Sequence, residues 1–147
     1  IGTFFLTHPE IRIPEGSGSY AVNEANEPAW DDNVRDMVAA FRRQESRCGA
    51  RQARYSGALV ADVHRILLKG GVFMYPPTTS KPNGKLRLLY ENAPLAFLVA
   101  HAGGSATDGR REILDITPTE LHQRTPLYLG SSGDVAEVQR LLGSGPD

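Results

Sequence analysis

Apolar residues recur at helical spacing in four stretches of the chain. Three or four apolar side chains per stretch fall on one face at i, i+3, i+4 and i+7, the pattern of an amphipathic helix. Serine or aspartate precedes most of these stretches and glycine follows most of them, as at helix ends. The four predicted helices begin near Asp31/Asp32 (Val34, Met37, Val38, Phe41), at Ser56 (Leu59, Val63, Ile66, Leu67, then Gly70–Gly71), near Tyr90 (Leu95, Leu98, Val99, Ala102, then Gly103–Gly104) and at Ser131 or Ser132 (Val135, Val138, Leu141, Leu142).

Short apolar and β-branched runs lie between these stretches and predict strands. The expected strands are Thr3–Leu6, Ile11–Ile13, Tyr20–Val22, Val72–Tyr75, Ser105–Ala106, Ile113–Leu114 and Leu127–Leu129. Pro76–Gly84 is rich in turn residues, and the polar run Arg42–Arg54 is expected to be a mobile surface loop. Alternating strands and helices predict an α/β fold, a mixed β-sheet flanked by helices on both faces.

Composition narrows the class of protein. The 147 residues suit a single domain, and 40% hydrophobic with 22% charged residues is typical of a globular protein. A formal net charge of −1 argues against a nucleic-acid binder, and the apolar runs are too short to span a membrane. The single cysteine, Cys48, is interpreted as a bystander in a reducing compartment, which favours a cytoplasmic location. The first residues, from Ile1 onward, do not have the pattern of a signal peptide. They resemble a strand from the middle of a longer protein.

The segment Lys81–Glu91 concentrates chemistry. After the turn Pro82-Asn83-Gly84 it offers Lys85 as a point charge and Arg87 as a planar fork, both suited to phosphate oxygens. Glu91 falls near a predicted helix start, where a carboxylate caps N–H groups or holds a divalent cation. On composition alone, a solvated junction with salt bridges is the commoner interpretation.

Other candidates are scattered. Arg54 and Tyr55 precede a predicted helix N-terminus and suit an anion, although a capped helix is commoner. Tyr75 ends a strand, where ligands of open α/β sheets gather, and Asn23 follows another strand as a ligand contact or a turn residue. Asp62, His64 and His122 show no acid–base or triad pattern and are interpreted as structural. The residues alone predict anion-binding groups without a complete active site.

Several of these stretches resemble class I fructose-1,6-bisphosphatases. Lys81–Glu91 is similar to the family stretch SPNGKLRLLYE, and residues 53–65 to ARYVGSMVADVHR. Residues 70–76 resemble GGIFLYP, residues 102–107 resemble the start of AGGMATTG, and residues 114–124 resemble LDVIPTDIHQR. Tyr20–Glu24 resembles YSLNEG and Leu129–Ser131 resembles LGS. The matches follow in order and cover the chain from about residue 20 to its last helix.

The resemblance implies a single C-terminal, sugar-phosphate-binding domain of a longer enzyme, with the N-terminal domain absent. That enzyme hydrolyses the 1-phosphate of fructose 1,6-bisphosphate in gluconeogenesis or the Calvin cycle, using Mg²⁺ or Mn²⁺. The N-terminal half would supply the other metal ligands, so this chain alone is expected to be inactive. The resemblance also implies a homotetramer for the full-length enzyme, and leaves a plastid location open.

The resemblance also assigns roles to individual residues. Asn23, Tyr55, Tyr75 and Lys85 would hold the sugar and its 6-phosphate, and Arg54 would reach the site of a neighbouring subunit. Arg87 would lie near the same pocket and Glu91 would be a metal ligand. The family usually has tyrosine three residues after the motif asparagine, where this chain has Asn26, which puts one hydroxyl contact in doubt.

Three alternatives remain open. A sedoheptulose-1,7-bisphosphatase would prefer the seven-carbon substrate, although Ile116–Arg124 is more similar to the fructose enzymes. An inositol-monophosphatase-like relative would share the pattern from Glu91 to Gly104, but Lys85 and Arg54-Tyr55 suit a second substrate phosphate. A non-catalytic module would bind sugar phosphates, or support assembly, without hydrolysis.

Overall fold

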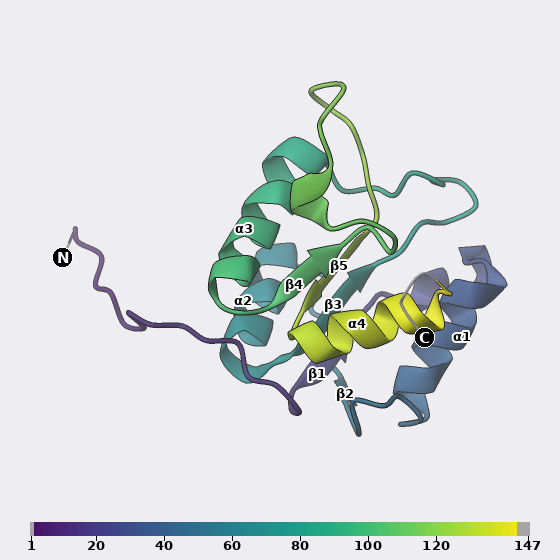
Figure 1. The fold of residues 1–147 in the computed structure, drawn as a ribbon, viewed down its shortest axis with the longest axis horizontal. Helices are drawn as coiled ribbons and strands as arrows, with labels where there is room; N and C mark the ends of the chain where they lie inside the picture. The colour runs from purple at the N-terminus through teal and green to yellow at the C-terminus, as the bar shows by residue number, and fades with distance from the viewer. Residues whose placement is uncertain (1, 144–147) are drawn as a thin grey trace.

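A five-stranded mixed sheet forms the centre of the computed structural model, which describes residues 2–143 (Figure 1). The strands are β1 (Ser19–Ala21), β2 (Gln52–Ala53), β3 (Gly71–Tyr75), β4 (Ser105–Thr107) and β5 (Leu127–Gly130). Their order is β2-β1-β3-β5-β4. β1 runs parallel to β2 and β3, whereas β5 runs antiparallel to β3 and β4. The predicted mixed sheet is therefore confirmed.

Helices cover both faces of this sheet (Figure 1). They are α1 (Asp32–Arg42), α2 (Leu59–Lys69), α3 (Ala93–His101) and α4 (Ser132–Leu141), with shorter turns η1 (Glu24–Ala29), η2 (Leu88–Asn92) and η3 (Ile113–Asp115). Side chains alternate across β3, so Val72 and Met74 pack with α1 and α4 while Phe73 packs with α2 and α3. Each helix buries its apolar stripe on one sheet face, as the predicted α/β class requires.

Of the four predicted helix starts, two are right, one is wrong, and the start near Tyr90 falls inside η2, which leads directly into α3. The Asp31 carboxylate accepts a 2.8 Å hydrogen bond from the Val34 N–H and caps α1. α4 follows Ser131, although its hydroxyl donates to the carbonyl of Pro14 instead of capping the helix. α2 starts at Leu59 rather than Ser56, because the Ser56 hydroxyl accepts from the Ala58 N–H and forms a turn first. Gly70, with φ of 79°, ends α2 as predicted.

Three of the predicted strands differ from the structure. Thr3–Leu6 has no partner strand among the described residues, and its Phe4, Phe5 and Leu6 are exposed. Ile11–Ile13 is no strand either, since only the Ile13 N–H reaches a neighbouring backbone, the Ala102 carbonyl at 2.9 Å. Ile113–Leu114 lies in the 3₁₀ turn η3, where Ile113 is buried but Leu114 is exposed. A short apolar run becomes a strand only where a sheet edge is available to pair with it.

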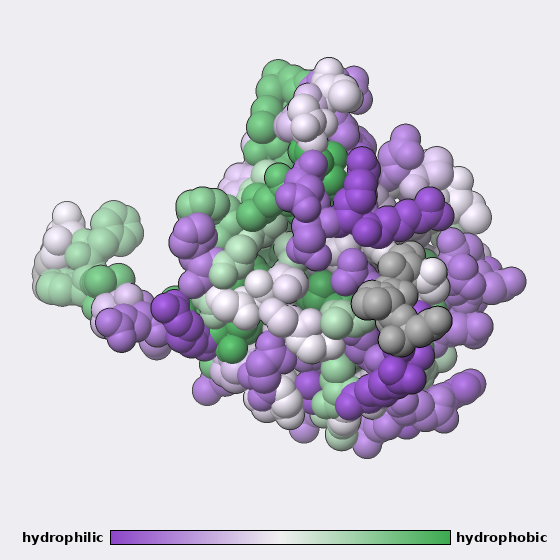
Figure 2. Space-filling model, in the orientation of Figure 1, coloured by the Kyte–Doolittle hydropathy of each residue, from purple (hydrophilic) through white to green (hydrophobic). Residues whose placement is uncertain are grey.

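The predicted apolar stripe of the third helix is partly wrong. Ala96, Val99 and Ala102 are buried, but Leu98 is 55% exposed. Because α3 is apolar on most sides, hydrophobic periodicity does not single out its inner face. Figure 2 shows apolar surface in green on the upper left, over the region where Figure 1 places α3, and mostly polar surface near α1 on the right.

The run Arg42–Arg54 is more ordered than a mobile surface loop. It contains β2, and its Ser46 and Arg51 are buried. Arg51 pairs with Asp134 of α4 through bonds of 2.8 and 3.1 Å. The charges that make the run look like solvated surface thus help in part to anchor it to α4.

Each helix among residues 2–143 is too short or too polar to cross a bilayer.

Candidate sugar-phosphate site

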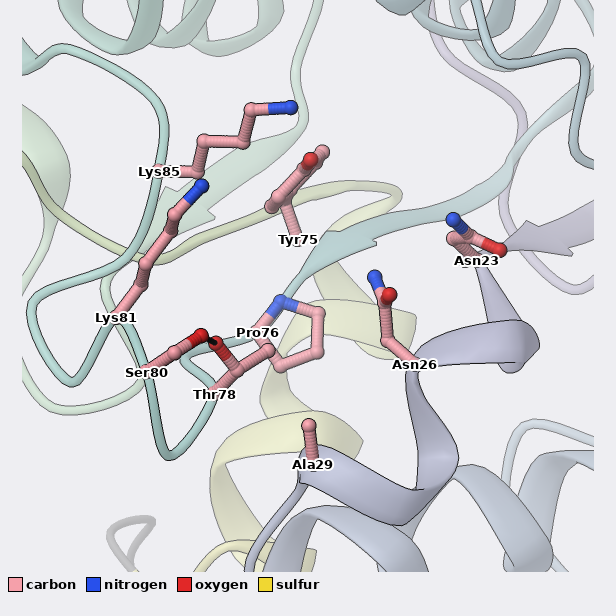
Figure 3. A pocket seen from close by; sticks show the side chains of 9 residues that line it. All are labelled: Asn23, Asn26, Ala29, Tyr75, Pro76, Thr78, Ser80, Lys81 and Lys85. Atoms are coloured by element: carbon pink, nitrogen blue, oxygen red, sulfur yellow. Dashed lines mark hydrogen bonds between the residues drawn. The ribbon is translucent and has the colours of Figure 1, made fainter.

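A polar cavity of about 230 Å³ opens beyond the carboxyl ends of β1 and β3 (Figure 3). Because these two strands are parallel, the residues that follow them meet at one edge of the sheet, where α/β folds bind ligands. The residues that line the cavity come from η1, the end of β3 and the loop after it: Asn23, Asn26, Ala29, Tyr75, Pro76, Thr78, Ser80, Lys81 and Lys85. The lining contains amides, hydroxyls and two ammonium groups but no carboxylate.

The cavity brings together Asn23, Tyr75 and Lys85, which the sequence places in three separate motifs. The side-chain amide oxygen of Asn23, Oδ1, accepts a 3.3 Å hydrogen bond from the Ala25 N–H and caps η1, so the turn role is also realised. Its amide nitrogen makes no hydrogen bond within the described part of the chain, so it can donate to a ligand oxygen. Asn26, at the position where the resemblance expects tyrosine, also lines the cavity.

Lys85 projects from a backbone that is held on both sides. The Gly84 N–H donates to the Lys81 carbonyl at 2.9 Å and closes the preceding turn. The Arg124 guanidinium donates to the Lys85 carbonyl, and the Thr125 N–H donates to the Leu86 carbonyl at 3.1 Å. The ammonium group therefore starts from a fixed Cα, which lowers the entropy lost when it binds an anion.

Tyr55 is not among the residues that line the cavity, but it lies near enough to the cavity residue Tyr75 to interact with it electrostatically. Burial raises the pKa of its hydroxyl, and the neighbouring Tyr75 and Asp62 raise it further. The hydroxyl therefore stays protonated at neutral pH and can donate a hydrogen bond. Tyr75 supplies a second hydroxyl in the cavity itself.

The strand and turn that carry Arg54 and Tyr55 are clamped from α2. The Arg54 N–H donates to the Tyr20 carbonyl at 2.9 Å, and Arg65 donates to the Arg54 carbonyl at 2.7 Å. Asp62, fully buried, accepts from the Ser56 N–H at 3.1 and 3.2 Å and pairs with Arg65 at 2.7 Å. Asp62 is structural, as predicted, but it is buried rather than on the helix surface.

This clamp changes the prediction of an anion site at the start of α2. The Ser56 N–H is already bonded to Asp62, so it is not available to an anion. Among the described residues the Arg54 side chain hydrogen-bonds only to the Gln52 amide oxygen, at 3.3 Å, and it is not part of the cavity lining. The structure of this chain therefore does not indicate an anion-binding site around Arg54.

Arg87 and Glu91 form a separate cluster, away from the cavity lining. The Glu91 carboxylate accepts a 2.7 Å hydrogen bond from the Arg87 N–H and pairs with its guanidinium at 3.3 Å. The guanidinium lies over the Tyr90 ring, 5.2 Å from the ring centre, and donates to the Tyr90 hydroxyl at 3.0 Å. His122 Nδ1 lies 2.8 Å from the same hydroxyl. Sequence analysis did not foresee this contact, because 32 residues separate the two side chains.

No group of three or more His, Cys, Asp and Glu side chains is placed to hold a metal ion between residues 2 and 143. Glu91 is one carboxylate, already paired with Arg87. A hard divalent cation takes several oxygen ligands, so these residues do not make a metal centre without ligands from elsewhere.

Sequence analysis did not select Thr78, Ser80 and Lys81 as site residues, although all three line the cavity. They belong to the turn-rich loop, and nothing in their type separates them from ordinary turn residues. One signal was available for Lys81. It precedes Lys85 by four residues across a Pro-Asn-Gly turn, which folds the two lysines back toward each other.

Together the fold and the cavity define an α/β domain that presents cations and hydrogen-bond donors at the carboxyl edge of a mixed sheet. The family model described as "Fructose-1-6-bisphosphatase, C-terminal domain" matches residues 13–143, and the chain belongs to this family. It is 52% identical over 145 residues to the class 1 fructose-1,6-bisphosphatase of Nostoc punctiforme, covering 99% of this chain and 40% of that protein. It is 53% identical over 136 residues to the enzyme of Chlorobium phaeovibrioides, covering 92% and 41%.

A solved structure agrees with these sequences. The crystal structure of Leishmania major fructose-1,6-bisphosphatase in holo form superposes with a TM-score of 0.88 and 42% sequence identity. The match covers 94% of this chain and 43% of the Leishmania chain. The chain thus spans about two fifths of the length of the relatives that it matches.

Proposed function

We propose that this chain forms the part of a class 1 fructose-1,6-bisphosphatase that binds the sugar and its 6-phosphate. The complete enzyme hydrolyses the 1-phosphate of fructose 1,6-bisphosphate to give fructose 6-phosphate and phosphate. The observation that carries the proposal is the cavity, because it joins Asn23, Tyr75 and Lys85 from three distant segments. Relatives that are 52% and 53% identical to this chain over the matched residues carry the name of that enzyme.

Each cavity group has a task in this proposal. The Lys85 ammonium neutralises phosphate charge, and charge-assisted hydrogen bonds of this kind are about twice as strong as neutral ones. The Tyr75 and Tyr55 hydroxyls and the Asn23 amide donate to phosphate or sugar oxygens. Arg54, which is exposed and whose side chain donates to the Gln52 amide oxygen, would reach the site of a neighbouring subunit in a homotetramer.

Hydrolysis needs groups beyond these residues. We assign Glu91 as one metal ligand and place Arg87 beside it, so the ion pair between them would open when a cation binds. The divalent metal, Mg²⁺ or Mn²⁺, would supply charge neutralisation and an activated water. The remaining ligands would come from the rest of the enzyme, and we expect no phosphate release from the 147 residues alone.

The exposed face of α3 supports a larger assembly. Phe97 is 53% exposed and Leu98 is 55% exposed, on a helix that is apolar on most sides. A helix of that kind is normally covered by protein on all sides. We propose that the part of the enzyme outside this chain covers the exposed face of α3.

We also propose the cytoplasm, inferred from the sequence, as the location of the enzyme.

Calorimetry with fructose 6-phosphate tests the proposed function. We expect measurable binding by the chain and a loss of at least about tenfold in affinity for Lys85→Ala, because the cavity then loses a charge that the ligand contacts. Lys69→Ala is the matched control, since Lys69 is an exposed lysine at the far end of α2 and should leave affinity unchanged. Absence of binding by the unaltered chain, or equal loss in both variants, would contradict the proposal.

A further inference from the structure

The cavity holds a second cation to which neither a motif nor the family assigns a role. Lys81 lines the cavity together with Lys85, on the wall opposite Asn26 (Figure 3). In Figure 3 the Lys81 and Lys85 side chains both extend inward from the left of the view, toward the side on which Tyr75 lies. The Lys81 side chain is therefore part of the cavity lining, although it is also exposed to solvent.

The backbone of Lys81 is fixed as firmly as that of Lys85. Its N–H donates to the Thr78 carbonyl at 2.9 Å, and its carbonyl accepts from the N–H groups of Thr78 at 3.2 Å and Gly84 at 2.9 Å. The Thr79 N–H donates to the Ala29 carbonyl at 2.8 Å and ties this turn to the end of η1. The turn and η1 thus hold the two walls of the cavity at a set separation.

Neither lysine has a partner for its charge in the structure. No ion pair among residues 2–143 includes Lys81 or Lys85, and no carboxylate lines the cavity. Two cations that share a polar cavity repel each other until an anion enters. An anion of two negative charges relieves that repulsion better than an anion of one, because it pairs with both ammonium groups.

We propose that Lys81 is a second phosphate-binding cation, which acts with Lys85 to select the dianionic form of a phosphate monoester. This inference rests on the proposed function and adds to it a residue and a charge preference. Lysine suits the task because its ammonium is a compact charge on a flexible stem, which can follow the ligand phosphate. Thr78, Ser80 and Asn26 add neutral hydrogen-bonding groups around the same volume.

The test compares fructose 6-phosphate binding by four variants of the chain, measured by calorimetry at pH 7.5 and low salt. We expect Lys81→Ala to weaken binding about 5- to 10-fold and Lys81→Arg to stay within about twofold, because arginine keeps the charge. Lys81→Gln should resemble the alanine variant, since it keeps polarity but not charge. Lys69→Ala, which removes an exposed lysine far from the cavity, should bind like the unaltered chain.

A second readout separates charge selection from simple contact. The second pKa of a phosphate monoester is about 6, so the ligand is mostly a dianion at pH 7.5 and a monoanion at pH 5. The loss caused by Lys81→Ala should shrink to about twofold at pH 5, where one cation suffices.

The outcomes distinguish this inference from the proposed function. If Lys85→Ala weakens binding and Lys81→Ala does not, or if Lys81→Arg binds as weakly as Lys81→Ala, the role of Lys81 is wrong while the proposed function stands. An equal loss at both pH values overturns the selection of the dianion. No binding of fructose 6-phosphate by the unaltered chain overturns the proposed function, and this inference with it.

Discussion

Two loops of this chain use their cations in opposite ways. Residues 43–51, here called the anchored segment, bury Arg51 against Asp134 of α4, with the two side chains 2% and 0% exposed. Residues 76–85, here called the pocket loop, direct Lys81 and Lys85 into a cavity that contains no carboxylate. A cation that has its partner within the chain holds the fold together. A cation that lines a polar cavity and has no partner there is a candidate for binding an anionic ligand.

Two further hydrogen bonds tie the anchored segment to α4. The Arg47 N–H donates to the Glu137 carboxylate at 2.8 Å, and the Cys48 thiol donates to the Gly133 carbonyl at 3.2 Å. Burial raises the pKa of the Cys48 thiol to about 11, and the carboxylates of Asp134 and Glu137 raise it as well. Cys48 is therefore a protonated, structural thiol at neutral pH, in agreement with its interpretation as a bystander.

The largest expected effect comes from breaking the buried pair of the anchored segment. Asp134→Ala leaves the Arg51 guanidinium buried without its partner, which typically costs about 3–5 kcal/mol. We expect a free energy of unfolding lower by about that amount in urea titrations followed by the fluorescence of the buried Trp30.

Arg43→Ala is the control for this prediction. Arg43 is an exposed arginine at the end of α1 that forms no ion pair within residues 2–143, so its loss should change stability by less than about 0.5 kcal/mol. Similar losses for the two variants would show that the segment is not anchored through Arg51. The difference between a structural and a ligand-binding cation would then disappear.

The pocket loop depends on backbone shape instead of ion pairs, and Gly84→Ala tests this. Gly84 has φ of +78°, and an added Cβ would lie 2.5 Å from the backbone of Thr125 and Pro126. We expect a loss of about 2–3 kcal/mol in unfolding free energy, from left-handed strain together with the clash. Fructose 6-phosphate binding should weaken as well, because Lys85 is the next residue.

Gly57→Ala separates strain from the clash. Gly57 has nearly the same φ, +81°, but nothing lies within 4 Å of its added Cβ. Only the conformational cost remains, about 1 kcal/mol. Equal losses for Gly84→Ala and Gly57→Ala would mean that the approach of the pocket loop to Thr125 and Pro126 contributes nothing.

Sequence predicts the elements of this fold better than their partners. The stripe of α1 (Val34, Met37, Val38 and Phe41) is buried as expected. The opposite face of this helix is polar, so hydrophobic periodicity identifies the inner face. Thr3–Leu6 has strand-like composition but no sheet edge beside it, and α3 lacks the polar side that would identify its inner face. Pairing and burial depend on segments distant in the chain, which local patterns do not contain.

In the candidate site, too, some features could be predicted from sequence motifs and others depend on residues far apart in the chain. Asn23 comes soon after β1, Tyr75 ends β3 and Lys85 lies in the loop after it, so the three meet in the cavity at one edge of the sheet. The residues alone predicted scattered groups, and only the family resemblance implied one shared pocket. The partnership of Arg51 and Asp134 was missed, since 83 residues separate them. Lys81 was missed as a site residue because a lysine in a turn looks the same whether it faces solvent or a cavity.

The smallest effect that we predict is a dependence of stability on pH in the anchored segment. Hydrogen bonds from Arg140 lower the pKa of the Glu137 carboxyl below its ordinary value of 4.5, and the Arg47 N–H contributes to the same shift, although burial opposes it. A carboxyl with a lowered pKa in the folded state stabilises the fold above its unfolded pKa, and this stability is lost as the pH falls through the folded value. Glu137→Gln should therefore reduce stability at pH 7 by less than about 1 kcal/mol, because Arg140 is partly exposed.

The sign of the pH dependence decides this prediction. The difference between the unaltered chain and Glu137→Gln should shrink as urea titrations move from pH 7 to pH 3, since the unaltered carboxyl becomes neutral as well. Glutamine keeps an oxygen that can accept from the Arg47 N–H, so the variant removes the charge alone. Glu45→Gln, an exposed position in the same segment, should show no difference at either pH. If the difference for Glu137→Gln stays constant or grows toward pH 3, the Glu137 carboxylate does not hold this segment through its charge, and Arg51–Asp134 is the ion pair that anchors it.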